Sequence, residues 1–306
     1  VHGLNYVWAK FIIENTTKKI LYVVWGAEVY GNPYLYSKSL YGEHTAKLAK
    51  EIQQKNLTQK IKDFINKYRF NLPNLSQEKV WKFNQKALSK IEYISVMFKD
   101  EIELYKDNNV IPETTKFIKF GYYPIEYFMK KIDEDIELEN NIMIGNSSSL
   151  TNNHLEVFHK LNSLGVQNKM IVPLSYGSKR LTKKLTSVGK KMFGEKFVPI
   201  TNFLPLKDYT KLMQTCGIVI MNQYRQQAVG NIITAVYLGA KVFLDERNTI
   251  YAYLKRLGCH VYKLDEIKTK QDFSRLDKIQ ISENREILKN DISANNLVRE
   301  LRNKIH

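Results

Sequence analysis

The chain has 306 residues, 43% of them hydrophobic, a length that fits two smaller α/β domains better than one large one. Its formal net charge of +16 predicts an anionic partner, either nucleic acid, a phosphorylated substrate or an anionic membrane surface. No stretch approaches the roughly 20 apolar residues that span a bilayer, so we expect a soluble or peripheral protein. The two cysteines, Cys216 and Cys259, support neither a disulfide framework nor a zinc site and fit a reducing cytoplasm best.

The first part of the chain, residues 1–130, predicts an incomplete α/β domain. Val1-His2-Gly3 resembles the end of a strand, so we expect the first βα units of this domain to be missing. Apolar runs predict further strands, separated by long helical segments rich in Lys and Tyr: 20–25, 91–98 and 116–120. Pro124 and the acidic stretch 131–139 predict a linker.

The second part, residues 131–306, predicts a complete nucleotide-binding domain. Apolar runs of strand length alternate with turns and helical stretches, which is typical of a doubly wound parallel sheet. Six strands are expected: 142–144, 169–174, 196–200, 217–222, 240–244 and 259–262. The segment from residue 282 onward predicts a pair of amphipathic helices.

A loop rich in small polar residues follows the strand at 142–144 and precedes a helix, for which Thr151 or Asn152 is the expected N-cap. Such a turn presents free amides, and a helix N-terminus attracts phosphate. The donor-binding candidates here are Gly145, Asn146, Ser147, Ser148 and Asn153. The pattern is neither a Walker loop nor GxGxxG, so by itself it also fits an ordinary βα loop.

A second polar stretch follows the strand at 217–222. Arg225 is suited to bidentate phosphate contacts and the neighbouring glutamines to a sugar or base, although an exposed Arg and glutamines would look the same. The candidates are Arg225, Gln226, Gln227, Gly230 and Asn231, with a helix expected over 232–238, and Tyr176 at a third strand end suits base stacking or domain packing. Because ligands bind outside the carboxyl ends of parallel strands, these motifs together predict a diphosphate site.

The N-terminal part offers candidates for acceptor chemistry. Trp25 and Tyr30 suit stacking on a sugar, and Glu28 is the first candidate for the general base that deprotonates an acceptor hydroxyl. His2 is the second candidate, and a structural role for either side chain is the alternative. Basic residues outnumber acidic ones between Lys38 and Lys131 and alternate with aromatics, which suits a membrane surface or nucleic acid. The scattered histidines and the lack of an HExxH or CxxC motif give metal binding little support.

These motifs, in this order, resemble glycosyltransferase family 56, which includes the TDP-Fuc4NAc:lipid II Fuc4NAc transferases of enterobacterial common antigen synthesis. The resemblance rests on His2-Gly3, residues 25–30, 145–154, Pro173 with Tyr176-Gly177, and 225–230. It implies a GT-B enzyme, with two Rossmann-like domains facing a cleft, that inverts the anomeric centre without a metal or other cofactor.

The implied substrates are a dTDP-activated 4-acetamido-4,6-dideoxygalactose and a polyprenyl-diphosphate-linked glycan. The implied location is the cytoplasmic face of the bacterial inner membrane, as a peripheral protein without a nucleic-acid partner. Two rival hypotheses stay open at this point. One is a GT-B-like nucleotide-sugar epimerase, and the other is a basic nucleic-acid-binding protein.

Overall fold

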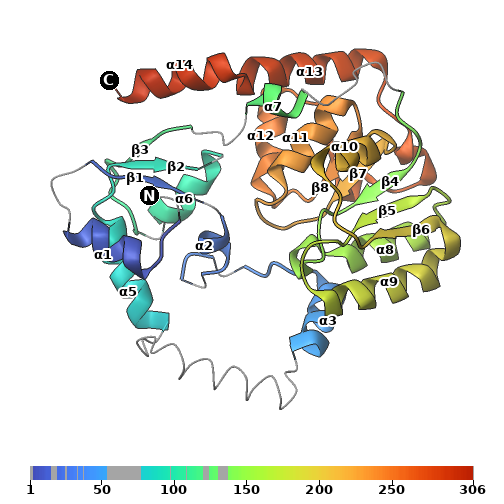
Figure 1. Ribbon diagram of the computed structural model, residues 1–306, viewed down its shortest axis with the longest axis horizontal. Coiled ribbons are helices and arrows are strands. Elements are labelled where there is room, and N and C mark those ends of the chain that lie inside the picture. Colours follow the sequence, from blue (N-terminus) through green and yellow to red (C-terminus); the bar gives the residue numbers. More distant parts are fainter. Residues whose placement is uncertain are drawn as a thin grey trace. The chain divides into compact units, whose positions relative to one another are not determined.

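The computed structural model (Figure 1) describes residues 3–14, 19–24, 26–32, 34–36, 38–53, 77–96, 98–107, 109–119, 124–129 and 137–305. Contacts divide the chain into two compact units. Unit 1 comprises residues 1–38, 50–120 and 299–306, and unit 2 comprises 39–49 and 121–298. The segment 39–49 therefore belongs to unit 2 although it comes early in the chain.

Unit 1 contains a three-stranded parallel sheet in the order β1-β2-β3. Its described elements are α1 (Tyr6–Glu14), β1 (Leu21–Val23), α2 (Ala27–Tyr30), α5 (Gln77–Leu88), β2 (Tyr93–Ser95), α6 (Asp100–Asp107) and β3 (Lys116–Phe117). Each strand lies inside a run that the sequence predicts. Only the first residues of β1 and β2 are partly exposed, whereas Tyr22 and Ile94 and the residues after them are buried. Tyr22 packs edge-on against Tyr105 of α6.

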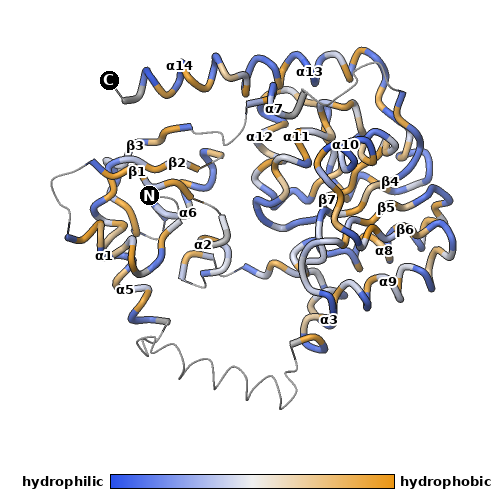
Figure 2. Tube along the Cα trace, viewed as in Figure 1, coloured by the Kyte–Doolittle hydropathy of each residue, from blue (hydrophilic) through white to orange (hydrophobic). Residues whose placement is uncertain are grey.

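Unit 2 contains a six-stranded parallel sheet in the order β6-β5-β4-β7-β8-β9. The strands are β4 (Ile142–Ile144), β5 (Met170–Pro173), β6 (Phe197–Ile200), β7 (Ile218–Met221), β8 (Lys241–Leu244) and β9 (Val261–Lys263). All six match the predicted runs. The central strands β4, β5 and β7 are buried along their whole length, which their uninterrupted hydrophobic sequences require (Figure 2).

Helices cover both faces of this sheet, with α8 and α9 side by side (Figure 1). The helices that lie wholly in unit 2 are α7 (Ile125–Met129), η1 (Leu150–Asn152), α8 (His154–Ser163), α9 (Lys179–Phe193), η2 (Gly194–Lys196), α10 (Leu206–Gln214), α11 (Val229–Leu238), α12 (Thr249–Leu257), η3 (Leu264–Glu266), η4 (Lys270–Phe273) and α13 (Lys278–Ile292). Two more helices, α3 (Glu43–Gln53) and α14 (Ala294–Ile305), are divided between the two units. Helices α13 and α14 confirm the predicted C-terminal helix pair. No helix in the described ranges is long and apolar enough to cross a membrane.

The early segment 39–49 is bound to α8. The carboxylate of Glu156 accepts hydrogen bonds from the backbone N–H (2.9 Å) and the hydroxyl of Thr45, so it caps the first turn of α3. The rings of His44 and His159 stack with their centroids 3.9 Å apart. A Cβ at Gly42 would lie 2.4 Å from the Glu156 carboxylate, so the close approach depends on glycine.

Candidate donor site at the carboxyl edge of the unit 2 sheet

The strand order of unit 2 reverses between β4 and β7. The chain proceeds from β4 to β5 and β6 on one side, then crosses to β7, β8 and β9 on the other. The loops that follow β4 and β7 thus leave adjacent strands at one edge, and Gly145 N donates to Ile220 O at 2.9 Å across that junction. Ligands of doubly wound sheets bind at this reversal point. The first two predicted loops are therefore brought together.

The loop after β4 is held from within by Asn152. Its side-chain oxygen accepts from Asn146 N (3.1 Å) and from Gln223 Nε2 (2.7 Å), while its amide nitrogen donates to Ser147 O (3.1 Å) and Oγ (3.2 Å). Asn152 is buried, so water does not compete for these hydrogen bonds. Asn152 thereby joins the two strand-end loops.

Gly145 must be glycine for two reasons. Its φ is +66°, and a Cβ would lie 2.6 Å from Nε2 of His154 and 2.9 Å from Oδ1 of Asn152. The His154 ring is buried, and Nε2 has no hydrogen-bond partner among the residues that the structure describes. Burial lowers the pKa of His154 to about 3, so the imidazole is neutral near pH 7 and unsuited to base chemistry there.

Asn153 ties three segments together. Its side chain donates to Asn222 O (3.0 Å) and Leu40 O (3.1 Å) and accepts from Gly42 N (3.0 Å). The residue is fully buried with φ +49°, a conformation that Asn tolerates. Asn153 is therefore placed to position the loops. The N-cap expected at Thr151 or Asn152 was wrong, because a 3-10 turn occupies residues 150–152 and α8 begins at His154, with Asn153 as its N-cap.

The loop after β7 ends in an unusual helix start. Ala228 is the N-cap of α11 with φ +60° and makes no side-chain capping bond, and the first turn contains no acid. Gly230 and Asn231 lie in that turn and are half-buried, and α11 begins three residues before the predicted start. The first amides of a helix lack intrahelical acceptors, so this terminus is suited to an anion.

Arg225 and the two glutamines lie between β7 and that terminus. Arg225 is half-buried, and its Nη1 donates to Gln226 O at 2.9 Å. Gln227 accepts from the hydroxyl of Thr151 at 2.6 Å, a second link to the loop after β4. The guanidinium of Arg247 lies over the ring of Tyr224, 3.3 Å from the ring centroid. Asp245 accepts two hydrogen bonds of 2.7 Å from that guanidinium.

The third predicted loop, after β5, pairs directly with the first. Ser148 N donates to Tyr176 O (2.6 Å), and Ser178 N donates to Ser148 O (3.0 Å). Gly177 has φ +118°, and a Cβ there would lie 2.2 Å from Ser148 O, so no other residue fits. The Tyr176 side chain is 80% exposed, and Phe203, which follows the adjacent strand β6, is 82% exposed. Both present open aromatic faces.

The acceptor candidates are only partly described. Gly26 precedes α2, Tyr30 is its last residue, and the backbone of Glu28 lies within it. The Glu28 side chain, His2 and Trp25 fall outside the described residues. Tyr30 is buried, donates its hydroxyl to Glu101 at 2.9 Å and packs against Tyr36. That geometry gives Tyr30 a packing role in unit 1.

Four residues of the assembled site were not among the predicted ligands: Asn152, His154, Asn222 and Gln223. Their signal in the sequence was weak, because polar residues beside a strand end look the same whether they bind a ligand or each other. The structure shows that Asn222 and Gln223 are buried and bonded to the loop after β4.

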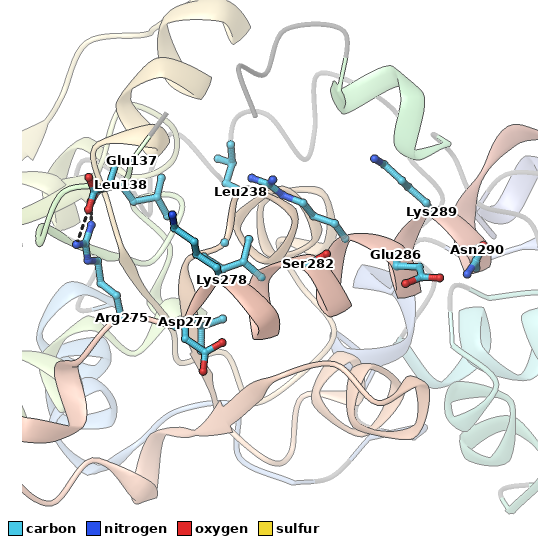
Figure 3. Close-up of a pocket in the computed structure, with 14 residues that line it drawn as sticks. Glu137, Leu138, Leu238, Arg275, Asp277, Lys278, Ser282, Glu286, Lys289 and Asn290 are labelled. Carbon is cyan, nitrogen blue, oxygen red and sulfur yellow. Dashed lines mark hydrogen bonds and ion pairs between the residues drawn. The ribbon is translucent and has the colours of Figure 1, made fainter. Parts of the chain in front are cut away.

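A cavity of about 1190 Å³ lies at the opposite edge of the sheet (Figure 3). Its lining comes from the residues before β4, the end of α11 and helix α13, including Glu137, Arg275 and Arg285. Glu137 and Arg275 form an ion pair of 2.9 Å within it. The cavity is therefore separate from the strand-end loops. Among the described residues no group of three His, Cys, Asp or Glu side chains could hold a metal ion.

Comparison with known proteins agrees with this architecture. The family described as 4-alpha-L-fucosyltransferase, glycosyl transferase group 56, matches residues 96–287. A glycosyltransferase from Rickettsia africae ESF-5 is 13% identical, with 99% of this chain and 95% of that chain covered and a TM-score of 0.56. HepE of Anabaena, solved in complex with UDP-glucose, is 11% identical over 97% and 81% of the two chains, with a TM-score of 0.57.

Other similar structures are longer than this chain. It spans 62% of the trehalose-6-phosphate phosphatase N-terminal domain of Candida albicans, at 9% identity over 76% of this chain and a TM-score of 0.55. It spans 64% of the sucrose-phosphate synthase of Thermosynechococcus elongatus, at 10% identity over 78% of this chain and a TM-score of 0.55. These similarities confirm the expected fold class, which is GT-B with Rossmann-like parallel sheets.

Proposed function

Because the chain belongs to the 4-alpha-L-fucosyltransferase family of glycosyl transferase group 56, we propose that it transfers a sugar from a nucleotide-diphosphate donor. The donor would bind at the carboxyl edge of the unit 2 sheet. One observation carries this assignment: α11 starts at the reversal point of the sheet without a side-chain cap, close in sequence to Arg225. The hydrogen bonds that join the loops after β4, β5 and β7 also support the assignment.

Within this proposal the diphosphate lies against the first turn of α11. The amides around Gly230 and the guanidinium of Arg225 neutralise the charge that builds up as the bond between the anomeric carbon and the diphosphate oxygen breaks. The exposed ring of Tyr176 is available for stacking on the base. Asn152, Asn153 and Gln227 act by holding the loops in place.

The finer assignment follows from the family resemblance. The donor is a dTDP-activated 4-acetamido-4,6-dideoxygalactose, and the acceptor is a polyprenyl-diphosphate-linked glycan at an anionic membrane surface. Glu28 or His2 takes the proton of the acceptor hydroxyl, whose oxygen attacks the anomeric carbon with inversion while the nucleoside diphosphate leaves. No metal is required in this scheme, because amides and Arg225 supply the positive potential.

Nucleotide binding tests the donor site. Titration with dTDP, UDP and GDP should raise the melting temperature of the wild-type chain, most for dTDP, because binding to the folded state stabilises it. Arg225→Ala should weaken dTDP binding by about tenfold or more, the typical value of a charge-assisted contact to phosphate. Arg302→Ala, which removes an exposed arginine of α14, is the matched control and should bind dTDP within twofold of wild type.

Chemistry tests the rest of the proposal. Labelled donor and a lipid-linked acceptor should give labelled glycan, and Glu28→Gln compared with His2→Ala in that assay separates the two base candidates. Conversion of the donor without any acceptor would instead indicate an epimerase. Normal dTDP binding and transfer by Arg225→Ala would remove the proposed role of that residue.

A further inference from the structure

Helix α9 has a strongly cationic outer face, on which Ser187 is the one exposed residue without a charge. The helix contains six basic residues and no acid: Lys179, Arg180, Lys183, Lys184, Lys190 and Lys191. All six are exposed, whereas Leu181, Leu185 and Gly189 face the protein and are buried. Spacings of four and seven residues align the cations in two adjacent rows, opposite the buried stripe. In Figure 1, α9 lies beside α8 on one face of the unit 2 sheet.

Helix stability explains only part of this charge pattern. Lys190 and Lys191 lie in the last turn, where a cation favours the helix dipole, but Lys179 and Arg180 occupy the first turn, where a cation opposes it. Lys179 and Lys183 are four residues apart, and like charges at that spacing repel each other. With no acid in α9, none of the cations is neutralised within the helix. A face that costs stability in this way is suited to an external anionic partner.

An exposed apolar side chain lies at the end of the strand that α9 covers. Gly189 lets the helix approach β6, because a Cβ there would lie 2.2 Å from the ring of Phe197. The chain leaves β6 at Ile200, and three residues later Phe203 is 82% exposed. Leu206, at the start of α10, is 44% exposed. The N-terminus of α9 lies at this same carboxyl edge, after β5.

We propose that the outer face of α9, with Phe203 beside its N-terminal end, docks unit 2 on a surface of anionic lipid headgroups. Five of the six cations are lysines, whose flexible stems let the ammonium groups follow a headgroup layer. The cationic face lacks an aromatic residue between its charges, so it has no platform for stacking nucleic-acid bases. An aromatic ring at its end suits the interface of a bilayer instead.

The purpose of this docking rests on the proposed function. A lipid-linked acceptor lies in the bilayer, and a docked unit 2 would hold its donor edge at the same surface. The binding itself does not require a nucleotide, however. The two ideas can therefore fail separately.

The test is vesicle binding by the full chain. Wild type is mixed with vesicles of phosphatidylcholine containing 30% phosphatidylglycerol and, separately, of phosphatidylcholine alone, and the bound fraction is measured by flotation. A lysine near an anionic surface strengthens binding by roughly fivefold, so Lys183→Gln/Lys190→Gln/Lys191→Gln should weaken it by about 10- to 100-fold. Raising the salt should weaken wild type toward the level of this triple variant.

Matched controls separate the face from the overall charge. Lys255→Gln/Lys268→Gln/Lys270→Gln removes the same charge from exposed positions elsewhere in unit 2 and should bind vesicles within about threefold of wild type. Phe203→Ser should weaken binding several-fold at high as well as low salt. Ile279→Ser, at a 70% exposed position of α13, should leave it unchanged.

The outcomes decide between partners. Equal losses in the two triple variants would overturn the proposal, as would retention of vesicle binding by the α9 variant. So would binding of a single-stranded RNA oligonucleotide through α9 that is at least tenfold tighter than binding to the vesicles in the same buffer. If dTDP stabilises no variant while vesicle binding still depends on α9, the donor assignment fails and the docking surface stands.

Discussion

Asn152 is the residue whose loss should disturb the candidate site most sharply. Truncation to Ala removes five hydrogen bonds, two received from Asn146 N and Gln223 Nε2 and three given, two to Ser147 and one to Ser149 O. Gln223 and Ser147 remain buried and Asn146 remains half-buried, and each buried group left without a bond costs about 1–3 kcal/mol. Because the loop can relax in part, we expect Asn152→Ala to lower the free energy of unfolding by roughly 2–4 kcal/mol.

Two further variants make this prediction specific. Asn162→Ala removes the same side chain from an exposed position of α8 and should cost less than about 0.5 kcal/mol. Asn152→Asp keeps both accepting bonds but loses the three donations and buries a carboxylate, so it should also be destabilising. The assays are urea unfolding and titration with dTDP. Binding of dTDP should weaken because Asn152 no longer holds the loop after β4 against the loop after β7. An Asn152→Ala protein with the stability and dTDP affinity of wild type would refute the reasoning.

Three other predictions follow from neighbouring contacts. Gly177→Ala should destabilise unit 2 by about 2 kcal/mol or more, since φ is +118° and the added Cβ meets Ser148 O; Gly194→Ala, with φ +56° and open space around it, should cost less, and equal costs would contradict the steric argument. Burial lowers the pKa of His154 to about 3, so the stability it contributes is full above pH 6.5 and is lost as the pH falls toward 3. Unfolding measured at pH 7 and pH 5 should show a loss of about 2 kcal/mol that His154→Gln abolishes, and an unchanged pH dependence would argue against a buried neutral ring. Glu156→Gln should speed amide exchange in α3 by about fivefold, because the carboxylate caps its first turn, whereas Glu195→Gln should have no effect; protection of α3 that does not change would show that the cap is dispensable.

The strands of unit 2 were predictable because their hydrophobic runs are uninterrupted and each is followed by a turn. Ile142–Ile144 and Ile218–Met221 were identified within one residue at either end. Their adjacency in the sheet is what makes the loop after each of them part of one site. The strand order itself is a property of the whole domain, and it was not predicted, because no single segment encodes which strands are neighbours.

The roles of individual polar residues were harder to predict. Asn153 was expected to contact the donor, yet it is fully buried and bonded to two backbone carbonyls. A sequence does not distinguish an amide that binds a ligand from one that binds a neighbouring loop, because both need the same residue beside a strand end. The docking of Thr45 on Glu156 was also unforeseen, since the two are 111 positions apart.

A structure of the chain with bound dTDP would test the central claim most directly. The account predicts that the diphosphate lies within hydrogen-bond distance of the Arg225 guanidinium and of the first amides of α11. Tyr176 should lie on the side of the base. A diphosphate bound instead in the cavity at the other edge of the sheet, against Arg275 and Arg285, would contradict the account.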